Sequence, residues 1–519
     1  MLVETLQTRL LTEVNIDTHK STLYLNTLEY NVRLSVSYTY FYSNFFQSTN
    51  AVPMQTAAAP LDPSLSFKAG ITHRQQTILK CAAALVGISA LLAPLVVATL
   101  LSWTLFFLFA VLITWRAFLV LVGALNRKLS APDVFADPDT DDLPIYSVLI
   151  AAYNEAPVMR QLATALQHLQ WPADRLDIQL LLEADDADTF RAANRAGFPA
   201  STRIVRVPAG GPRTKPNALN YGLAQARGRF VTVFDAEDLP HPRQILAAHT
   251  AFQKASARTV CVQAPLIADN IKSNWLTAHW GLEYQVQFGL LLPSTSLYRM
   301  PVLIGGTSNH FRRDALLALG GWDPYNVTED ADLGMRIARA RLLTETITTP
   351  TYEDAPRTFS VWLSQRSRWI KGYMQTWMVL MRNPRKAARQ MGWGPFAAMQ
   401  FSLGGAILAP LGHLLFAALS LLAVLDGDLA LGRAGLILLL SGYAVSLFSD
   451  LSAPGRLSWH RLVTALTRPL YWPLLSLAAY RAAWELAYRP FFWAKTPHHP
   501  RETESEQSLS TGSSAFASA

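Results

Sequence analysis

The sequence is poor in charged residues and in cysteine. Only 16% of its 519 residues are Asp, Glu, Lys or Arg, while 50% are hydrophobic. This balance excludes a disordered chain and is unusual for a soluble enzyme. The two cysteines, Cys81 and Cys261, lie far apart, so we expect neither a disulfide framework nor a cysteine-based metal site, and a reducing cytosolic setting is the simplest. The hydrophobic excess predicts membrane-spanning segments beside one catalytic domain.

Basic residues outnumber acidic residues in the sequence. There are 45 Lys and Arg residues against 37 Asp and Glu residues, a formal net charge of +8. A basic excess suits nucleic-acid binding, but it also suits the cytosolic flanks of membrane spans. Because apolar runs already predict a membrane protein, we expect the lipid bilayer as partner and no nucleic acid.

The chain begins without a recognisable signal peptide. In residues 1–53 there is no sustained apolar run and no basic segment that leads into one. We interpret 1–76 as a weakly structured extension, with Met54 as an alternative start because a more ordinary leader follows it.

Residues 77–125 are predicted to form a transmembrane hairpin. No charged residue occurs between Cys81 and Trp115, and two helices over 77–98 and 101–124 are long enough to cross a bilayer. Arg116 interrupts the second helix, where a charge is costly, so it should snorkel to the surface or face a protein interior. Basic residues on both flanks place both ends in the cytosol, at a bacterial inner membrane.

An acidic linker over 126–143 leads into a segment, 144–381, with the pattern of an α/β domain. Strands are expected over 145–152, 178–183 and 230–234, with helices between them. This order predicts a parallel, Rossmann-like sheet whose ligands bind at the carboxyl ends of the strands.

Apolar character returns after this domain. Residues 382–449 are predicted to hold an interface segment and two spans, 396–425 and 431–448, joined by an acidic outer loop. Residues 450–497 are predicted to be a cytosolic loop and an interfacial or protein-packed helix over 469–492, with a fifth span as the alternative. The Ser-, Thr- and Glu-rich tail, 498–519, is expected to be disordered.

Acidic residues follow all three expected strands. These residues are Glu155, then Glu183 and Asp185, then Asp235, Glu237 and Asp238. An isolated acidic turn is most often only solvated, but parallel strand ends meet at one edge of a sheet. Carboxylate oxygens gathered there suit Mg²⁺ or Mn²⁺ on a pyrophosphate.

Three further motifs complete the candidate site. The loop Gly210–Asn220 carries Lys215 into a helix start, as an anion-binding loop would. Asp330, in Thr-Glu-Asp, is either part of a helix cap or the base that takes the proton of an attacking hydroxyl. Gln365, Arg368 and Trp369 share one helix face, where they suit a diphosphate and a sugar ring or a membrane-interface anchor.

In this order, the motifs of residues 145–381 resemble the family 2 glycosyltransferases, specifically the membrane-embedded processive synthases related to cellulose, curdlan, chitin and hyaluronan synthases. The resemblance implies a GT-A fold. It places the nucleoside at Ala151, Tyr153, Glu155, Glu183 and Asp185, and the metal at Asp235, Glu237 and Asp238. The sequence departs from the family here, with Glu-Ala-Asp-Asp for Asp-Asp-Gly and Asp-Ala-Glu-Asp for Asp-x-Asp.

The resemblance also assigns the remaining motifs. Lys215 would face the diphosphate or donor sugar, Asp330 would be the general base, and Gln365, Arg368 and Trp369 would form the acceptor and diphosphate platform, with Gly306 and Glu329 beside it. Trp493, Lys495 and Thr496 are similar to a gating loop, or form a membrane-interface anchor.

Together these observations predict an inverting, processive β-glycosyltransferase that polymerises a nucleotide-diphosphate sugar, UDP-glucose by resemblance, onto a growing glycan, with Mg²⁺ or Mn²⁺ on the diphosphate. Periplasmic or outer-membrane export subunits would be its partners. The alternatives are a non-processive membrane enzyme that transfers one sugar to a lipid carrier or glycolipid, and a non-enzymatic glycan-export component. No residue identifies the sugar or the linkage.

Overall fold

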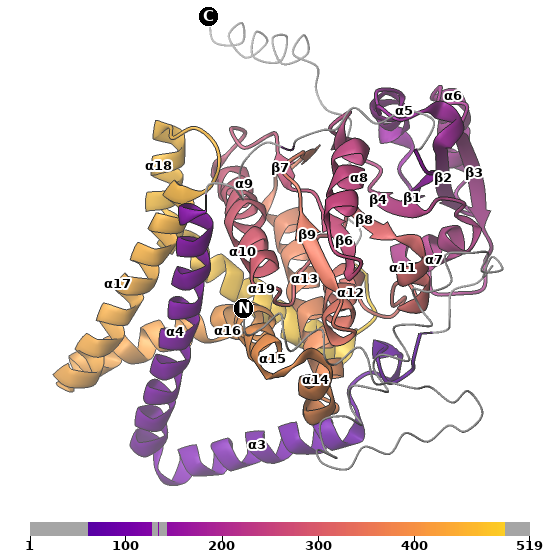
Figure 1. Cartoon of the computed structure of the whole chain (residues 1–519). Coiled ribbons are helices and arrows are strands. Elements are labelled where there is room, and N and C mark those ends of the chain that lie inside the picture. Colours follow the sequence, from indigo (N-terminus) through magenta and orange to yellow (C-terminus); the bar gives the residue numbers. More distant parts are fainter. Residues whose placement is uncertain (1–60, 127–132, 134–142, 494–519) are drawn as a thin grey trace, which may run out of the picture. The chain divides into compact units, whose positions relative to one another are not determined.

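The computed structural model describes residues 61–126, 133 and 143–493, which all fall within one compact unit, Ala57–Ala519. Figure 1 labels its elements along the chain. Our expectations for most of the N-terminal extension, for the tail, for most of the acidic linker and for Lys495 and Thr496 fall outside the described residues.

A seven-stranded sheet organises the α/β domain. Its order is β3-β2-β1-β4-β8-β6-β9. The strands are β1 Tyr146–Ala152, β2 Leu176–Glu183, β3 Thr202–Val207, β4 Phe230–Phe234, β6 Thr259–Gln263, β8 Asn309–Arg312 and β9 Leu343–Thr346. A second sheet of three short strands has the order β5-β10-β7, with β5 Leu239–Pro240, β7 Leu266–Ala268 and β10 Thr351–Glu353.

The expected parallel pairing holds for only part of the large sheet. Strand β1 pairs in parallel with both β2 and β4, and β2 pairs in parallel with β3. Strand β8 runs antiparallel between β4 and β6, so the sheet is mixed and the expectation of a parallel sheet is corrected. The parallel half nevertheless brings the carboxyl ends of β1, β2 and β4 to one edge.

Two hydrophobic cores bury the two faces of this sheet, because successive side chains of a strand point to opposite faces. Val148 and Ile150 pack into one core with α5 Met159–Gln167, α6 Ala187–Arg195 and α8 Gln244–Lys254. Leu149 packs into the other with α7 Lys215–Gln225, α11 Arg313–Ala318 and α12 Glu329–Arg339. The domain therefore has three layers.

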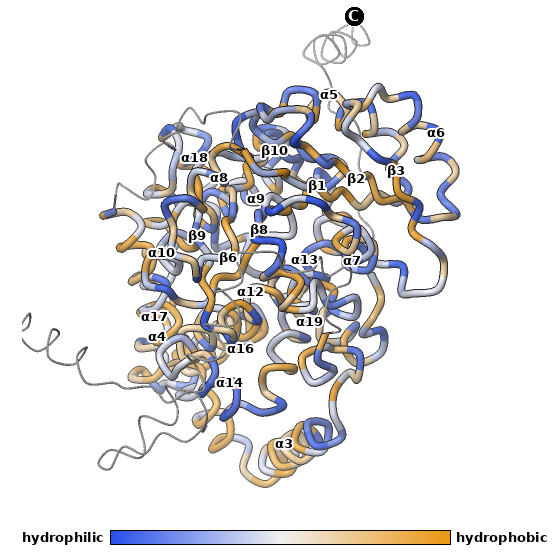
Figure 2. Tube along the Cα trace, turned by 45° about the vertical axis from the view of Figure 1, so that its right-hand side comes forward, coloured by the Kyte–Doolittle hydropathy of each residue, from blue (hydrophilic) through white to orange (hydrophobic). Residues whose placement is uncertain are grey.

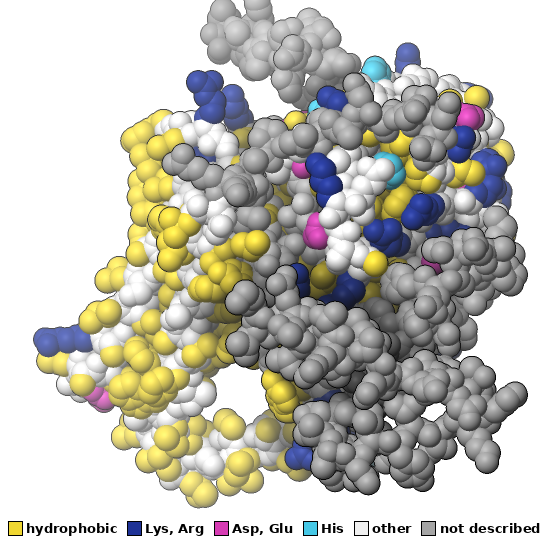
Figure 3. All heavy atoms as spheres, viewed as in Figure 1, with side chains coloured by type: hydrophobic (Ala, Val, Ile, Leu, Met, Phe, Trp, Pro, Cys, Tyr) yellow, Lys and Arg dark blue, Asp and Glu magenta, His cyan; other side chains and the backbone are white. Residues whose placement is uncertain are grey.

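Four helices are long and apolar enough to cross a membrane among the described residues. They are α3 His73–Leu92, α4 Pro94–Leu125, the continuous stretch Trp393–Leu425 and α17 Leu429–Ser452. The stretch Trp393–Leu425 consists of α15 Trp393–Met399, the π-helical segment Gln400–Gly404 and α16 Gly405–Leu425. Many hydrophobic side chains lie at the surface of the left-hand part of Figure 3, where these helices are. Helix α3 is hydrophobic along most of its length in Figure 2.

The turn of the hairpin lies at Ala93, earlier than the expected turn between 98 and 101. Pro94 is the physical reason, because proline is favoured in the first turn of a helix and cannot continue the preceding one. Helix α4 then packs against α3, α16 and α17.

The remaining helices join the sheet to the apolar helices. They are α9 Trp275–Val286, the π-helical segment Gln287–Leu291, α10 Leu292–Leu297, α13 Phe359–Leu380, α14 Pro384–Met391, α18 Trp459–Leu466 and α19 Arg468–Tyr488. Helix α19 packs against α13 and α16, and its Tyr471, Ala478 and Ala482 are fully buried. It is thus packed within the protein, and it is not among the four candidate spans.

Candidate active site

One cavity of about 1160 Å³ connects the carboxyl ends of the parallel strands with the space between α4, α16, α17 and α19. Most residues singled out from the sequence line it, although they come from distant parts of the chain. They are Ala151, Tyr153, Glu155, Glu183, Lys215, Asp235, Glu237, Gly306, Glu329, Asp330, Gln365, Arg368, Trp369 and Trp493. The fold thus brings the expected strand-end, loop and helix motifs to one place.

Lys215 lies at the centre of the polar part of this cavity. As the first residue of α7, it donates a 2.7 Å hydrogen bond to the backbone oxygen of Gly306 and forms an ion pair with Asp235. Burial by itself would lower the pKa of Lys215, but the carboxylates of Asp235 and Glu329 outweigh it and raise that pKa. A permanently charged ammonium therefore stands at the end of β4.

Asp330 lies in the first turn of α12, close to this ammonium. A Cβ atom added to Gly306 would lie 3.4 Å from Oδ2 of Asp330 and 3.9 Å from Nζ of Lys215, so Gly306 separates the two side chains. Oδ1 of Asp330 is buried and accepts no hydrogen bond from the described residues. Thr328 occupies the cap position, but its side chain makes no capping hydrogen bond. The arrangement thus favours a role for Asp330 in contact with a ligand in the cavity over the helix-cap interpretation.

Helix α13 holds this turn in place. Gln375 accepts a hydrogen bond from the backbone N–H of Val327 at 2.9 Å, and Asn326 donates to Thr376 at 2.9 Å. A Cβ atom on Gly372 would lie only 2.1 Å from Oγ1 of Thr328, so glycine is required for this close approach. The helix that carries Gln365, Arg368 and Trp369 is therefore docked directly on the loop that carries Asp330.

Burial also sets the protonation of the acidic pair at the start of α12. It raises the pKa of Asp330, and together with the neighbouring Asp330 carboxylate it raises the pKa of Glu329 to about 7. Two carboxyl groups this close titrate as a pair.

This pairing predicts a pH dependence. A base must be deprotonated, so kcat/KM should fall as the pH is lowered below about 7 and the pair takes up a proton. Glu329→Gln should move this acid limb to lower pH, because it removes the neighbouring carboxyl group. A pH–rate profile between pH 5 and 9 measures this acid limb. The control is Asp314→Asn, at an exposed carboxylate. An acid limb in Glu329→Gln at the same pH as in wild type would contradict the pairing.

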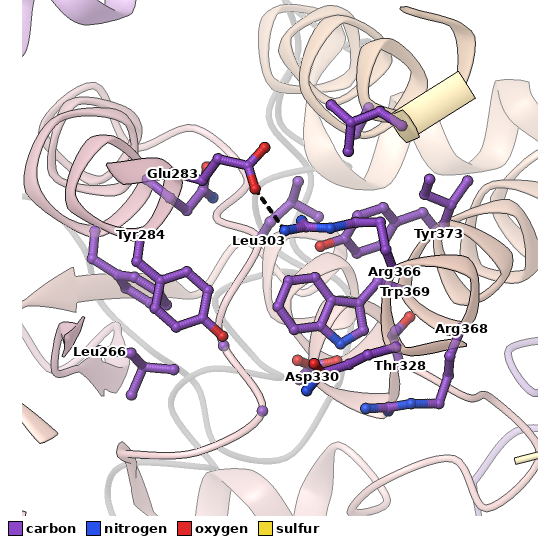
Figure 4. Close-up of a pocket in the computed structure, with 18 of the residues that line it drawn as sticks. Leu266, Glu283, Tyr284, Leu303, Thr328, Asp330, Arg366, Arg368, Trp369 and Tyr373 are labelled. Carbon is purple, nitrogen blue, oxygen red and sulfur yellow. Dashed lines mark hydrogen bonds and ion pairs between the residues drawn. The ribbon is translucent and has the colours of Figure 1, made fainter. Parts of the chain in front are cut away.

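Aromatic rings and a partly buried ion pair form another part of the cavity wall. The ring of Tyr284 lies parallel to that of Trp369, with centroids 6.2 Å apart, and Trp280 lies 4.8 Å from Trp369. Arg366 lies over Trp369 at 4.7 Å and pairs with Glu283 at 2.6 Å. Figure 4 shows Tyr284 and Trp369 on facing sides, with Asp330 and Arg368 below the indole. This surface suits the apolar face of a sugar ring.

Arg368 reaches the cavity from the same helix. Its guanidinium lies 5.0 Å from the ring of Trp493, the described residue of the expected gating loop. The segment before Trp493 is fixed to α13, because Lys371 donates to the backbone oxygen of Phe492 at 2.7 Å and pairs with Glu485 at 2.9 Å.

Two expected site residues do not line the cavity. Asp185 pairs with Arg213 at 2.8 Å on a half-exposed surface, while Glu183 faces the cavity instead. Asp238 is fully buried; its Oδ2 accepts from the backbone N–H of Asp235 at 2.7 Å and from Thr307. Burial beside Asp235 raises its pKa well above the usual range. Asp238 thus stabilises the turn in this structure, and its expected role as a metal ligand stays a prediction.

The remaining carboxylates fit a divalent ion only in part. Asp235 and Glu237 both line the cavity with hard oxygen donors. Within the described part of the chain, no three His, Cys, Asp or Glu side chains are grouped to hold a metal by themselves. The set suits an ion whose other ligands are phosphate oxygens.

The sequence interpretation missed the part of the cavity between the apolar helices. Phe109, Leu112 and Ile113 of α4 and Leu438 and Leu439 of α17 line this part of the cavity. It also missed Glu283 and Tyr284. A weak signal exists for Glu283, which is the single acidic residue between 275 and 297.

Comparisons with known proteins identify the α/β part of the chain. Residues 144–372 match the family described as "Glycosyltransferase like family 2". The chain therefore carries a family 2 glycosyltransferase domain, with the GT-A-like fold that the motifs implied. The enzyme class expected from these motifs is confirmed for this domain.

Two curated relatives are similar over this region. A beta-monoglucosyldiacylglycerol synthase of Trichormus variabilis is 26% identical over 52% of this chain and 60% of its own length. Cellulose synthase 2 of Novacetimonas hansenii is 25% identical over 46% of this chain and 15% of its own. The chain thus spans less than two thirds of the length of each of these relatives.

A solved structure is also similar. The mannosyltransferase of Pyrobaculum calidifontis, in complex with GDP-Man and Mn²⁺, is 20% identical and covers 73% of this chain and 99% of its own, with a TM-score of 0.49.

Proposed function

We propose that the protein transfers a single sugar from a nucleotide-diphosphate sugar, UDP-glucose by resemblance, to the hydroxyl group of a membrane lipid. The continuity of the cavity carries this proposal, because one space joins Lys215, Asp235 and Asp330 to an apolar crevice between helices that could cross a membrane. Phe109, Leu112, Ile113, Leu438 and Leu439 line that crevice with side chains that suit acyl chains. The similarity to a glucolipid synthase supports the same acceptor class.

The chemistry is a direct displacement at the anomeric carbon. Asp330 takes the proton of the acceptor hydroxyl while the hydroxyl oxygen bonds to that carbon. The bond from the carbon to the diphosphate breaks on the opposite side, and the nucleoside diphosphate leaves with the electron pair. Lys215 and Arg368 offset the charge that develops on the leaving group. One displacement with one base inverts the anomeric configuration.

Asp235 and Glu237 would hold a divalent ion, which would neutralise the diphosphate as a Lewis acid. Asp235 also keeps Lys215 in position through their ion pair.

Processive synthesis of an exported polysaccharide is the second candidate. Gln365, Arg368 and Trp369 line the cavity in the spacing that resembles polymer synthases, and a cellulose synthase is among the relatives. Export subunits would then be required as partners. The two candidates share the donor site and differ in what occupies the space between the apolar helices.

Product analysis separates the two candidates. The full chain in proteoliposomes would receive radiolabelled UDP-glucose, UDP-N-acetylglucosamine or GDP-mannose with Mg²⁺ or Mn²⁺. We expect label in a small, organic-extractable lipid from one donor, lost with EDTA and restored by the metal. Label in a large, glycosidase-digestible product would instead support the polymerase, and no incorporation from any donor would contradict both.

The crevice predicts a steric effect on the acceptor alone. Ala406→Trp, on the face of α16 that lines the cavity, should fill the space for acyl chains and lower transfer to lipid at least tenfold, on the order of the loss of 1.4 kcal/mol or more. Binding of UDP, measured by calorimetry, should not change. The control is Leu408→Trp on the same helix, whose position is 43% exposed and does not line the cavity. Equal losses in both variants would contradict an acceptor site there.

A further inference from the structure

Arg116 is a charged residue of a helix that could cross a membrane, and it lines the cavity. It forms no hydrogen bond or ion pair with any residue that the structure describes. A charge inside a membrane-spanning helix is costly and by default indicates a functional contact. The described residues therefore supply no hydrogen-bond or ion-pair partner for this arginine.

The acidic groups nearest to Arg116 are already engaged. Asp450 and Glu283 act on its charge from α17 and α9, and Arg468 acts on it from α19. Asp450 binds Arg468 through two hydrogen bonds of 2.8 and 2.9 Å. Glu283 binds Arg366 at 2.6 Å and accepts from the hydroxyl of Tyr471 at 3.0 Å.

Arg116 and the four charged residues around it all line the cavity, so a ligand there would experience their net charge. The three guanidinium groups and two carboxylates are Arg116, Arg366, Arg468, Asp450 and Glu283. One formal positive charge remains uncompensated within this cluster. Arg461, the other buried arginine beside Asp450, bonds to backbone oxygens at the end of α17 and does not reduce the excess.

The position of the excess charge indicates the kind of anion. Leu112 and Ile113 precede Arg116 by four and three residues, so all three share a face of α4. That face lines the apolar crevice. On the other side, Arg366 lies over the ring of Trp369, on the helix docked against the Asp330 loop. An anion at Arg116 would thus lie between acyl chains and the sugar-transfer site.

We propose that Arg116 binds the phosphate of an anionic lipid, so that the acceptor is a phosphate-bearing lipid and not a neutral one. The Asp450–Arg468 and Glu283–Arg366 pairs occupy the carboxylates that would otherwise neutralise Arg116. A guanidinium bonded to phosphate in a water-poor cavity forms a strong, charge-assisted contact. This inference rests on the proposed function, in that it names the class of its lipid acceptor.

A matched pair of ligands tests the binding step without turnover. Phosphatidate and diacylglycerol with the same short acyl chains differ only in the phosphate group. Native mass spectrometry of the purified full chain would measure both, for wild type, Arg116→Gln and Arg116→Lys. We expect Arg116→Gln to bind phosphatidate about tenfold more weakly or worse, diacylglycerol binding to be unchanged, and Arg116→Lys to retain most phosphatidate binding.

Two controls distinguish binding at Arg116 from lipid binding elsewhere on the protein and from binding of a soluble phosphate. Arg433→Gln, at an exposed arginine of α17 that does not line the cavity, should bind phosphatidate like wild type. Equal phosphatidate binding by Arg116→Gln and wild type would overturn the proposal. Displacement of phosphatidate by inorganic phosphate or UDP at equal concentration would assign the site to a soluble phosphate and would also overturn it.

Transfer assays distinguish this failure from that of the proposed function. They use diacylglycerol as the neutral lipid and phosphatidylglycerol as the anionic one, because phosphatidate has no free hydroxyl group to accept a sugar. If only neutral lipid receives sugar and Arg116→Gln transfers normally, the acceptor inference fails while the lipid glycosyltransferase stands. If no lipid of either charge receives sugar, the proposed function fails, whatever Arg116 binds.

Discussion

Asp330→Asn should lower kcat for sugar transfer by about 10²–10⁴-fold, the usual contribution of a general base. The variant removes the carboxylate proposed to take the proton of the acceptor and changes little else, because Oδ1 of Asp330 has no hydrogen-bond partner among the described residues. In the proposed site the nucleotide sugar contacts Lys215 and the strand ends instead, so its affinity should stay within about threefold of wild type. Initial rates with labelled donor and calorimetry with UDP measure the two quantities.

The control is Asp314→Asn, because the side chain of Asp314 is 88% exposed. Loss of UDP affinity in parallel with kcat would indicate that Asp330 supports the fold and not the reaction. A rate above one tenth of wild type would assign the base to another group, and Glu329, which is buried beside it, would be the next candidate.

Lys215→Met should have the second-largest effect, on kcat/KM for the donor. The ammonium of Lys215 bonds to Gly306 and pairs with Asp235, so its loss removes a fixed positive charge and leaves that carboxylate uncompensated. Loss of one preorganised electrostatic contact costs about 2.7–4 kcal/mol, or roughly 10²–10³-fold. Steady-state kinetics at varied donor concentration would show a raised KM together with a lowered kcat.

Two further variants separate charge from packing. Lys215→Arg retains the positive charge and should recover part of kcat/KM. Lys254→Met, at the exposed end of α8, should behave like wild type. If Lys215→Met lowered kcat alone, with donor KM unchanged, the proposed contact between Lys215 and the donor would be wrong.

The strands that carry the donor site could be predicted closely from the sequence. Strand β4 has the expected bounds, and β1 differs at one end by a single residue. A buried parallel strand is a short apolar run whose signal is contained in neighbouring residues. The parallel pairing of β1, β2 and β4 then places acidic strand ends together, as expected. Strand β8 was missed because its antiparallel pairing depends on residues far away in the chain.

The direction in which individual side chains of a motif point could not be predicted from the sequence. Asp235 and Asp238 are three residues apart and equally acidic, yet only Asp235 lines the cavity. Asp238 turns inward, where its Oδ2 accepts from the backbone N–H of Asp235 and from the hydroxyl of Thr307. Such hydrogen bonds are set by the path of the loop, and residue type alone does not report them.

The sequence by itself determined the class of protein: a family 2 glycosyltransferase domain beside apolar helices, with Asp330, Lys215 and the face of Gln365, Arg368 and Trp369 as its candidate site. These signals are local, because each depends on residues within a few positions of one another. Only the tertiary structure decided that the donor site opens into a crevice between α4, α16 and α17, and that Arg116 faces it. Helix packing joins residues hundreds of positions apart, and the acceptor class follows from the space that this packing leaves.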